Sequence, residues 1–305
     1  MKDIAWKGER ISRFVLGTAQ LGMDYGIANV CGQPSEKLAC EIVKTALGYG
    51  VNCFDTAQAY GNSEVALGRA LRYCGAGPDI KIVSKLSPKL QPTDSKAVEE
   101  SIEASCQNLG VDQLWCLMLH RADWLDVWDE GLGQVLSDVV RRGFIKYLGV
   151  STYWPNEARG ALENSDIQII QVPCNAWDQR MKAAGVFELA KGLNKLCLVR
   201  SIYLQGLLIM STEEVRKKLP KATEVSQQWH KLAEGYNLRP LELAIGFAKS
   251  LRQPLVVGVD NTAQIIENFS LFEKVELPKK IIENTRLQVD DEDIIIPSRW
   301  KMLRE

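Results

Sequence analysis

Histidine is scarce in this sequence, because the 305 residues include only two, His120 and His230. A count this low excludes a histidine-rich metal site. The eight cysteines are scattered, form no CxxC pair and have no histidine at ligand spacing, which argues against a disulfide framework and against a zinc site. We therefore expect reduced, structural thiols in a cytoplasmic protein.

An excess of charge of one sign is also missing, as are long apolar runs. The chain has 37 Lys and Arg against 38 Asp and Glu, a formal net charge of −1, and no basic cluster. Neither nucleic acid nor an anionic membrane is therefore expected as a partner. The N-terminus lacks the apolar run of a signal peptide, and no stretch reaches the roughly 18 apolar residues of a membrane span. These absences predict a soluble, unprocessed protein.

The glycine-rich phosphate loops of common nucleotide-binding folds are absent as well. The pairs Gly48/Gly50, Gly75/Gly77 and Gly131/Gly133 lack the third glycine of a G-x-G-x-x-G turn, and none links a strand directly to a helix. No Walker A pattern occurs either. A doubly wound nucleotide-binding sheet, the main alternative architecture, is therefore disfavoured.

The chain does contain a regular alternation of short apolar runs and helical patterns. The runs are nearly continuous in Val, Ile, Leu and Cys, as expected for parallel strands covered on both faces. Strands are predicted at 14–17, 52–55, 81–85, 113–119, 145–151, 167–172, 196–202 and 255–258. Helices are predicted at 35–48, 93–109, 125–141, 155–163, 179–189, 223–236, 240–250 and 262–273. Without a flexible linker, this pattern predicts a single-domain α/β (β/α)8 TIM barrel over residues 1–305.

Four reactive side chains follow three consecutive strands of this predicted barrel. Asp55 ends the second strand, and Tyr60 lies in the segment TAQAYG just beyond it. Lys85 ends the third strand, and His120 ends the fourth, LWCLMLH. Because catalytic side chains of such barrels gather at the carboxyl ends of the strands, we expect these four to converge.

The pKa values of these groups suggest their chemistry. The phenol of a free tyrosine has a pKa of about 10, which is high for a general acid at neutral pH. A nearby ammonium lowers that pKa, and a carboxylate keeps the ammonium charged and in position. We therefore predict that Tyr60 is a proton donor tuned by Lys85, that Lys85 pairs with Asp55, and that His120 binds the same substrate oxygen. Such a group suits protonation of the alkoxide formed when a hydride attacks a carbonyl.

Each residue taken alone also has a structural interpretation. Asp55 and Thr56 can cap the next helix, and Lys85 can be a solvated charge at a strand end. His120 can be a core histidine, and Tyr60 can belong to the packing of a turn. Their conjunction at successive strand ends favours the catalytic interpretation.

Several stretches together resemble the aldo/keto reductase superfamily, in register from about Leu16 to Phe269. The resemblance implies an (α/β)8 barrel that binds NADP(H) or NAD(H) in extended form and interconverts a small carbonyl substrate, such as an aldehyde, ketone or sugar-like compound, with its alcohol. The family's Asp-Tyr-Lys-His tetrad falls on Asp55, Tyr60, Lys85 and His120. The stretches are FDTAQAYGNSE (54–64), IVSKL (82–86), LMLHR (117–121) and KYLGVST (146–152).

The same resemblance assigns residues to the nicotinamide end of the cofactor. Gly17 and Thr18 match the Gly-Thr pair that lines the nicotinamide. Ser151 and Gln171 match the residues that hold its carboxamide, which needs both donors and acceptors. The asparagine that usually follows the serine is Thr152 here.

The segment VRSIYLQGLL (199–208) resembles the loop of the family that holds the pyrophosphate. Ser201, Gln205 and Gly206 keep the character of that loop. Arg200 stands where a ring usually stacks on the nicotinamide. Its guanidinium can stack on a flat ring, attract an anionic substrate or form a salt bridge under the loop, and the sequence leaves these alternatives open.

The segment VVGVDNTAQIIENF (256–269) resembles the strand and helix that bind the adenosine. Glu267 and Asn268 match adenine contacts. Members strict for NADPH often carry Lys and Arg at the positions of Gly258 and Gln264, and a carboxylate such as Asp260 repels a 2′-phosphate. NADH, NADPH or both thus remain open, as does a helix-capping role for Asp260. The positions on the ribose side are Gly258, Asp260, Asn261 and Gln264.

Substrate specificity has a weaker signal. Tyr25, in the long first loop (20–33), and Trp154 and Trp177 fall in loops at the top of the barrel, where they can form a pocket wall or pack the loops. The insertion 211–221 is either a helical flap or an ordinary solvated helix.

Two other functions remain as alternatives. A barrel with these features can bind a nicotinamide nucleotide as a sensor or partner subunit without catalysis. A lyase can form a Schiff base through Lys85.

Overall fold

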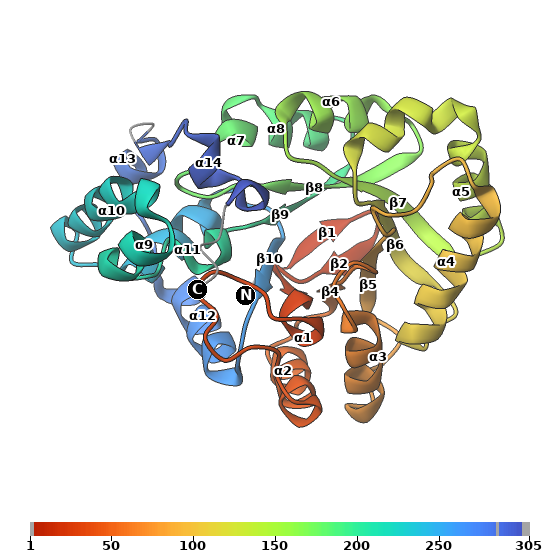
Figure 1. Cartoon of the computed structure of the whole chain (residues 1–305), viewed down its shortest axis with the longest axis horizontal. Helices are drawn as coiled ribbons and strands as arrows, with labels where there is room; N and C mark the ends of the chain where they lie inside the picture. The colour runs from red at the N-terminus through yellow and green to blue at the C-terminus, as the bar shows by residue number, and fades with distance from the viewer. Residues whose placement is uncertain (1–2, 285–286, 301–305) are drawn as a thin grey trace.

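Eight apolar runs pair side by side in parallel and close into a barrel, in the order β10-β3-β4-β5-β6-β7-β8-β9. The computed structural model describes residues 3–284 and 287–300 (Figure 1). The predicted (β/α)8 barrel is confirmed, and four of its strands have the predicted bounds. The strands are β3 (Phe14–Gly17), β4 (Cys53–Asp55), β5 (Lys81–Lys85), β6 (Leu114–Leu119), β7 (Ile145–Ser151), β8 (Ile167–Pro173), β9 (Leu196–Arg200) and β10 (Leu255–Gly258).

The register of the strands brings their carboxyl ends to one rim. Gly17 pairs with Asp55 across β3 and β4, and Ser151 pairs with Gln171 across β7 and β8. Arg200, the last residue of β9, pairs with Pro173. Side chains that follow these strands therefore lie at the same end of the barrel, which we call its upper end.

Helices surround the barrel, and their apolar faces cover its outer surface (Figure 1). The longer ones are α2 (Glu36–Gly48), α3 (Ser63–Tyr73), α4 (Ser95–Leu109), α5 (Leu132–Arg141), α6 (Pro155–Glu163), α10 (Thr223–Gly235), α11 (Pro240–Ser250) and α12 (Thr262–Lys274). Shorter ones are α1 (Ala19–Gly22), α7 (Arg180–Ala183), α8 (Val186–Gly192), α9 (Thr212–Lys218), α13 (Lys279–Ile282) and α14 (Glu292–Ile295).

Two predicted helices are each divided by a glycine. The segment 125–141 consists of η1 (Ala122–Glu130) and α5, which meet at Gly131 with φ of 119°. The segment 179–189 consists of α7 and α8, which are separated at Gly185 with φ of 69°. Both values lie in a region that favours glycine and is incompatible with a continuous helix. The prediction also missed α3, which buries Leu67 and Leu71.

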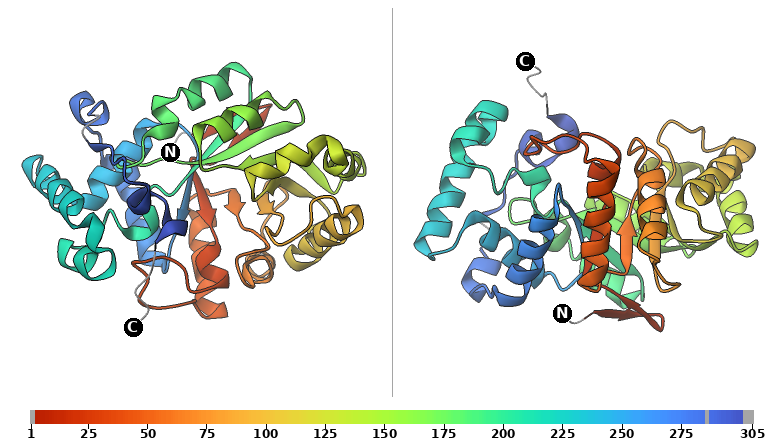
Figure 2. Two further views of the ribbon diagram at one scale, coloured as in Figure 1. Left: turned by 45° about the horizontal axis from the view of Figure 1, so that its top comes forward. Right: turned by 90° about the horizontal axis from the view of Figure 1, so that it is seen from below.

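A β-hairpin that was not predicted covers the other, lower end of the barrel. It pairs β1 (Ile4–Trp6) with β2 (Glu9–Ile11) through a two-residue turn in which Lys7 and Gly8 both have positive φ. Trp6 packs edge-on against Trp115 and Tyr147, with ring centroids 6.2 Å and 4.9 Å away. Figure 2 (right) shows the hairpin at one end of the barrel and the loop that follows α1 at the opposite end.

Two further findings concern the described ranges as a whole. Within residues 3–284 and 287–300, no helix combines the length and apolar character that crossing a membrane requires. The same residues contain no group of three or more His, Cys, Asp and Glu side chains placed to hold a metal ion.

Candidate active site

A cavity of about 560 Å³ opens at the upper end of the barrel, within the size range of small-molecule and cofactor sites. Asp55, Tyr60 and His120 line it. Of the residues predicted to hold a cofactor, it brings together Gly17, Thr18, Ser151, Gln171, Arg200, Ser201, Gln205, Gly206, Gly258, Asp260, Gln264, Glu267 and Asn268. Thr152 is buried outside this lining, and its hydroxyl has no hydrogen-bond partner in the described part of the chain.

Asp55 and Lys85 form a buried ion pair beneath the cavity. Lys85 Nζ donates to Asp55 Oδ1 at 2.7 Å and to the carbonyl oxygen of Thr56 at 2.9 Å, and the lysine is 0% exposed. Gln171 Nε2 donates to the same Oδ1 at 2.6 Å. Burial lowers the pKa of Lys85, and the charge of Asp55 opposes that shift. The predicted pairing of Lys85 with Asp55 is therefore present, and Gln171 stabilises it.

Tyr60 lies between the ion pair and His120. The ammonium of Lys85 is 5.0 Å from the centroid of the Tyr60 ring, and the ring meets that of His120 edge-on at 5.8 Å. Burial and the negative charge of Asp55 raise the pKa of Tyr60. The expectation of a lowered pKa is wrong, because burial and Asp55 outweigh the opposing effect of the positive charge of Arg200. The phenol therefore keeps its proton at neutral pH, as a proton donor requires.

His120 is a neutral imidazole in this site. Burial lowers its pKa to about 3, and the positive charges of Lys85 and Arg200 act in the same direction. Its Nδ1 is buried and has no hydrogen-bond partner among the described residues. A neutral ring of this kind can exchange hydrogen bonds with a ligand without adding charge to the site.

The loop that carries Tyr60 rests against α1 at two glycines. A Cβ atom on Gly22 would lie 2.0 Å from the carbonyl oxygen of Tyr60, and one on Gly61 would lie 2.2 Å from the carbonyl oxygen of Gly22. Gly61 also has φ of 58°, in the left-handed region. Asn62 N donates to Gly22 O at 3.3 Å. A larger residue at either glycine would displace the backbone of Tyr60.

The loop after β9 has an unusual backbone. Ser201, Leu204 and Gln205 have positive φ values of 62°, 49° and 55°. The N–H groups of Leu204 and Gly206 donate to the carbonyl oxygens of Ser201 and Tyr203, both at 2.9 Å, so these residues form a tight turn beside the cavity. A Cβ on Gly206 would lie 2.3 Å from Ala28 Cβ, because the first loop crosses directly over it. Ser201, Gln205 and Gly206 line the cavity at the place that the resemblance assigns to the pyrophosphate.

The end of the cavity that the resemblance assigns to the adenosine contains a carboxylate with one oxygen free to accept a hydrogen bond. Asp260 Oδ2 accepts from Gln264 Nε2 at 3.3 Å, whereas Asp260 Oδ1 is buried without a partner in the described ranges. The cap of α12 is Asn261, whose side chain accepts from Gln264 N at 3.0 Å. The capping role considered for Asp260 thus belongs to its neighbour. With amide-binding groups at Ser151 and Gln171, the lining fits a dinucleotide from end to end.

Arg200 lies at the reacting end and has no acidic partner. It donates to the carbonyl oxygen of Thr152 at 3.1 Å and to Ser201 Oγ at 3.3 Å, and it stacks on the ring of Tyr153 at 4.3 Å. No carboxylate of the described residues pairs with it. The alternative of a salt bridge under the loop is therefore wrong.

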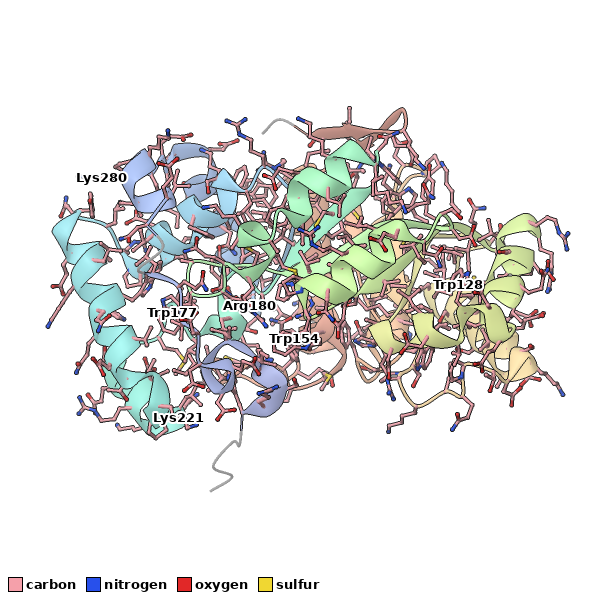
Figure 3. All side chains as sticks on the ribbon, turned by 90° about the horizontal axis from the view of Figure 1, so that it is seen from above. Trp128, Trp154, Trp177, Arg180, Lys221 and Lys280 are labelled. Atoms are coloured by element: carbon pink, nitrogen blue, oxygen red, sulfur yellow. The ribbon has the colours of Figure 1, made fainter. Side chains whose placement is uncertain are left out.

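Of the three aromatic residues considered for the substrate pocket, the structure brings Tyr25 to the cavity but neither tryptophan. Trp177 is 1% exposed and packs edge-on against Trp229 at 6.2 Å. Trp154 lies under Arg180, 4.5 Å from the ring centroid, and the two side chains are adjacent in Figure 3. Both tryptophans instead pack the loops, which was the other interpretation of their positions.

Several lining residues escaped the sequence analysis. Tyr153 directly precedes Trp154, and the sequence pattern of two aromatic residues after a strand end does not indicate which of them lines the cavity. The insertion 211–221 contains α9, which begins with a capping box between Ser211 and Glu214. Lys218 Nζ, at its end, donates to the carbonyl oxygen of Ile27 at 2.6 Å. The missed lining residues include Gln20, Tyr153, Ile202, Tyr203, Ile209, Met210 and Glu214.

Comparison with known proteins gives a consistent result. A model described as the aldo/keto reductase family matches residues 13–286. The chain is similar to aldo-keto reductase str7 of Strobilurus tenacellus, with 23% identity over 90% of this chain and 89% of the relative. It is also similar to D-arabinose 1-dehydrogenase of Saccharomyces cerevisiae, with 25% identity over 86% of this chain and 84% of the relative.

Solved structures agree on the fold. The holo form of aldo-keto reductase AKR11C1 from Bacillus halodurans has a TM-score of 0.74 at 21% identity, covering 92% of this chain and 94% of that one. Glycerol dehydrogenase AKR11B4 from Gluconobacter oxydans has a TM-score of 0.72 at 22% identity, covering 92% of each chain. At these identities the likeness concerns the barrel alone.

Proposed function

The chain belongs to the aldo/keto reductase family, and we propose that it interconverts a small carbonyl compound and its alcohol, with Tyr60 as the proton donor. A reduced nicotinamide cofactor, when bound, supplies the hydride that adds to the carbonyl carbon. Tyr60 donates its phenolic proton to the carbonyl oxygen, so that the C=O π bond breaks while one C–H and one O–H bond form. Solvent then returns a proton to Tyr60.

His120, Asp55 and Lys85 hold Tyr60 and the substrate in place. His120, neutral at working pH, hydrogen-bonds the carbonyl oxygen and orients it toward Tyr60. The buried pair of Asp55 and Lys85 keeps a fixed dipole beneath the phenol. In the reverse direction the same tyrosine receives the proton of the alcohol.

One observation carries this proposal. Asp55, Tyr60 and His120 line the same cavity as the groups that suit a carboxamide and a pyrophosphate. A sensor barrel would need the nucleotide-binding groups but not the reactive ones. A Schiff-base lyase would need an accessible amine, whereas Lys85 is fully buried and bound to two acceptors.

The test is oxidation of NADH or NADPH by a panel of carbonyl compounds. The names of two relatives, D-arabinose 1-dehydrogenase and glycerol dehydrogenase, support starting the panel with aldoses and small polyol-derived carbonyls. Tyr60→Phe should lower turnover by roughly a hundredfold or more while cofactor affinity is kept. Tyr153→Phe, the same change elsewhere in the cavity, is the matched control and should retain turnover. Substantial turnover in Tyr60→Phe would contradict the assigned proton donor.

We further propose that NAD(H) is preferred over NADP(H). Arg200 is the one Lys or Arg among the residues that line the cavity, and Arg239, near the adenosine end, is engaged by Glu267 at 2.6 Å. Among the residues that the structure describes, a 2′-phosphate would find no free cation there, whereas a ribose hydroxyl can donate to Asp260 Oδ1.

Titration of the protein with NADH and with NADPH tests this preference directly. NADH should bind more tightly by roughly tenfold, and Asp260→Ser should reduce the difference by improving the binding of NADPH. Equal affinities in the wild type would contradict the proposed preference but not the proposed reaction.

A further inference from the structure

Arg200 is a cation without a compensating charge at the reacting end of the cavity. It is the last residue of β9, and its guanidinium reaches the carbonyl oxygen of Thr152, the residue after Ser151. Two of its N–H groups have acceptors, both of them uncharged, and one face of the guanidinium is covered by Tyr153. It therefore lies among the groups that we propose hold the nicotinamide carboxamide.

The acidic side chains that line the cavity have other partners or lie elsewhere. Asp55 pairs with Lys85, and Glu214 binds Ser211 at the start of α9. Glu267 pairs with Arg239, and Asp260 belongs to the adenosine end. The charge at the reacting end is thus set by Arg200.

The field of Arg200 extends over the reactive groups. It lowers the pKa of Tyr60, where burial and Asp55 dominate in the opposite direction, and it adds to the lowering of the pKa of His120. Arg200 and the place where chemistry would occur are therefore close enough to interact electrostatically.

A nicotinamide cofactor changes charge at one place when it is oxidised. The oxidised ring carries a positive charge and the reduced ring is neutral, while the pyrophosphate and the adenosine are the same in both forms. A fixed cation near the ring therefore weakens binding of the oxidised form relative to the reduced form, because its effect on the shared pyrophosphate is the same in both.

We propose that Arg200 makes this cavity discriminate between the two redox states of its cofactor, so that the reduced form binds more tightly than the oxidised form. The inference rests on the proposed function, because it requires the nicotinamide to occupy the end lined by Ser151 and Gln171. Release of the oxidised form is then favoured after each reduction, and product inhibition by it is weak. Such a site is suited to work as a reductase.

The experiment compares Kd values for NAD+ and NADH, or for the NADP pair if that pair binds more tightly, by calorimetry without substrate. In the wild type, the oxidised form should bind roughly tenfold more weakly than the reduced form. Arg200→Gln should bring the two values close together by tightening the oxidised form. Arg200→Lys keeps the charge and should keep the difference, which separates charge from stacking by the planar guanidinium.

Arg239→Gln is the matched control, since it removes the same charge at the adenosine end. It should change both Kd values by the same factor and leave their ratio unaltered. Thermal unfolding of each variant checks that the fold is retained.

Two results would overturn the inference. One is a ratio of the two Kd values that stays unchanged in Arg200→Gln. If that variant instead raises only KM for anionic carbonyl compounds, Arg200 binds the substrate rather than distinguishing the redox states. The other is wild-type protein that binds both redox states equally. Failure of the wild type to bind either form would instead contradict the proposed function itself, together with the inference that rests on it.

Discussion

Polar side chains are hydrogen-bonded more completely at the lower end of the barrel than at the upper end. At the lower end, Glu9 accepts hydrogen bonds from Tyr147 Oη at 2.8 Å and Trp115 Nε1 at 2.9 Å, and it pairs with Lys146 at 3.0 Å and Lys81 at 3.7 Å. Both of its oxygens are in use. A cluster satisfied in this way stabilises the lower end. It also borders a second cavity, of about 870 Å³, which is lined by Glu9, Lys81, Trp115 and Lys146.

At the upper end, by contrast, several polar groups of the described residues lack a hydrogen-bond partner or an ion-pair partner. His120 Nδ1 and Asp260 Oδ1 are buried without partners among the described residues, and Arg200 has no acidic partner. Unsatisfied buried groups are costly for folding alone. Among the described residues, Arg13 Nε, just before β3, is the one such atom at the lower end, whereas His120 and Asp260 both line the cavity at the upper end. The unpartnered atoms that face a cavity therefore mark the functional end.

The largest expected effect comes from breaking the ion pair of the upper end. Lys85→Met leaves the charge of Asp55 buried without its partner, so the free energy of unfolding should fall by about 3–5 kcal/mol. Turnover should fall by roughly a hundredfold or more as the support for Tyr60 is lost. Urea unfolding and carbonyl reduction measure the two effects.

The control for that variant is Asp55→Asn combined with Lys85→Met. Removing both charges should recover much of the stability but none of the turnover. Full stability in Lys85→Met alone would show that the pair is not a stabilising element.

A smaller effect is expected from the matching change at the lower end. Glu9→Gln removes the charge that faces Lys81 and Lys146, and the free energy of unfolding should fall by about 1–3 kcal/mol. Turnover should stay within about twofold of the wild type, because this cluster is structural and lies at the opposite end of the barrel. A large loss of turnover in folded Glu9→Gln protein would contradict the separation of the two ends.

The smallest effect concerns pH. The pKa of His120 is lowered to about 3 in the folded protein from an ordinary value of 6.5. Between these values the unfolded chain binds more protons than the folded one, so the free energy of unfolding falls as pH decreases from 6.5 toward 3. His120→Asn should remove this contribution, worth about 1 kcal/mol at pH 5 after allowance for partial solvent exposure.

Thermal unfolding of wild type and His120→Asn at pH 7 and pH 5 measures the difference. A second readout is the dependence of kcat/KM on pH, which should show no break near pH 6.5 from the imidazole. Such a break, absent in His120→Asn, would mean that His120 is charged in the working enzyme.

The sequence predicted some parts of the molecule well because a simple physical rule governs them. Buried parallel strands read as apolar runs, so the bounds of β3, β5, β7 and β10 agree with the prediction. Asp55, Lys85 and His120 follow such runs directly, and the carboxyl ends of strands in a barrel meet at one rim. Their convergence with Tyr60 could therefore be inferred without coordinates.

Other features depend on three-dimensional context. The turn of the β1–β2 hairpin is formed by Lys7 and Gly8, whereas the strongest hairpin signals have Asn or Asp before the glycine. The pKa of Tyr60 depends on its burial and on the nearby charge of Asp55, and sequence spacing does not determine how deeply the phenol is buried. Trp177 could face a cavity or a neighbouring helix from the same loop, and only its packing against Trp229 decides between them.

The β1–β2 hairpin also constrains the route by which ligands can enter. It covers the lower mouth, and the barrel interior behind Trp6 is filled by packed side chains such as Val83, Met118 and Leu198. Within the described ranges, small molecules can reach Tyr60 only from the loop side. Cofactor and carbonyl compound would then share one entrance, which favours sequential kinetics, in which both are bound before either product leaves.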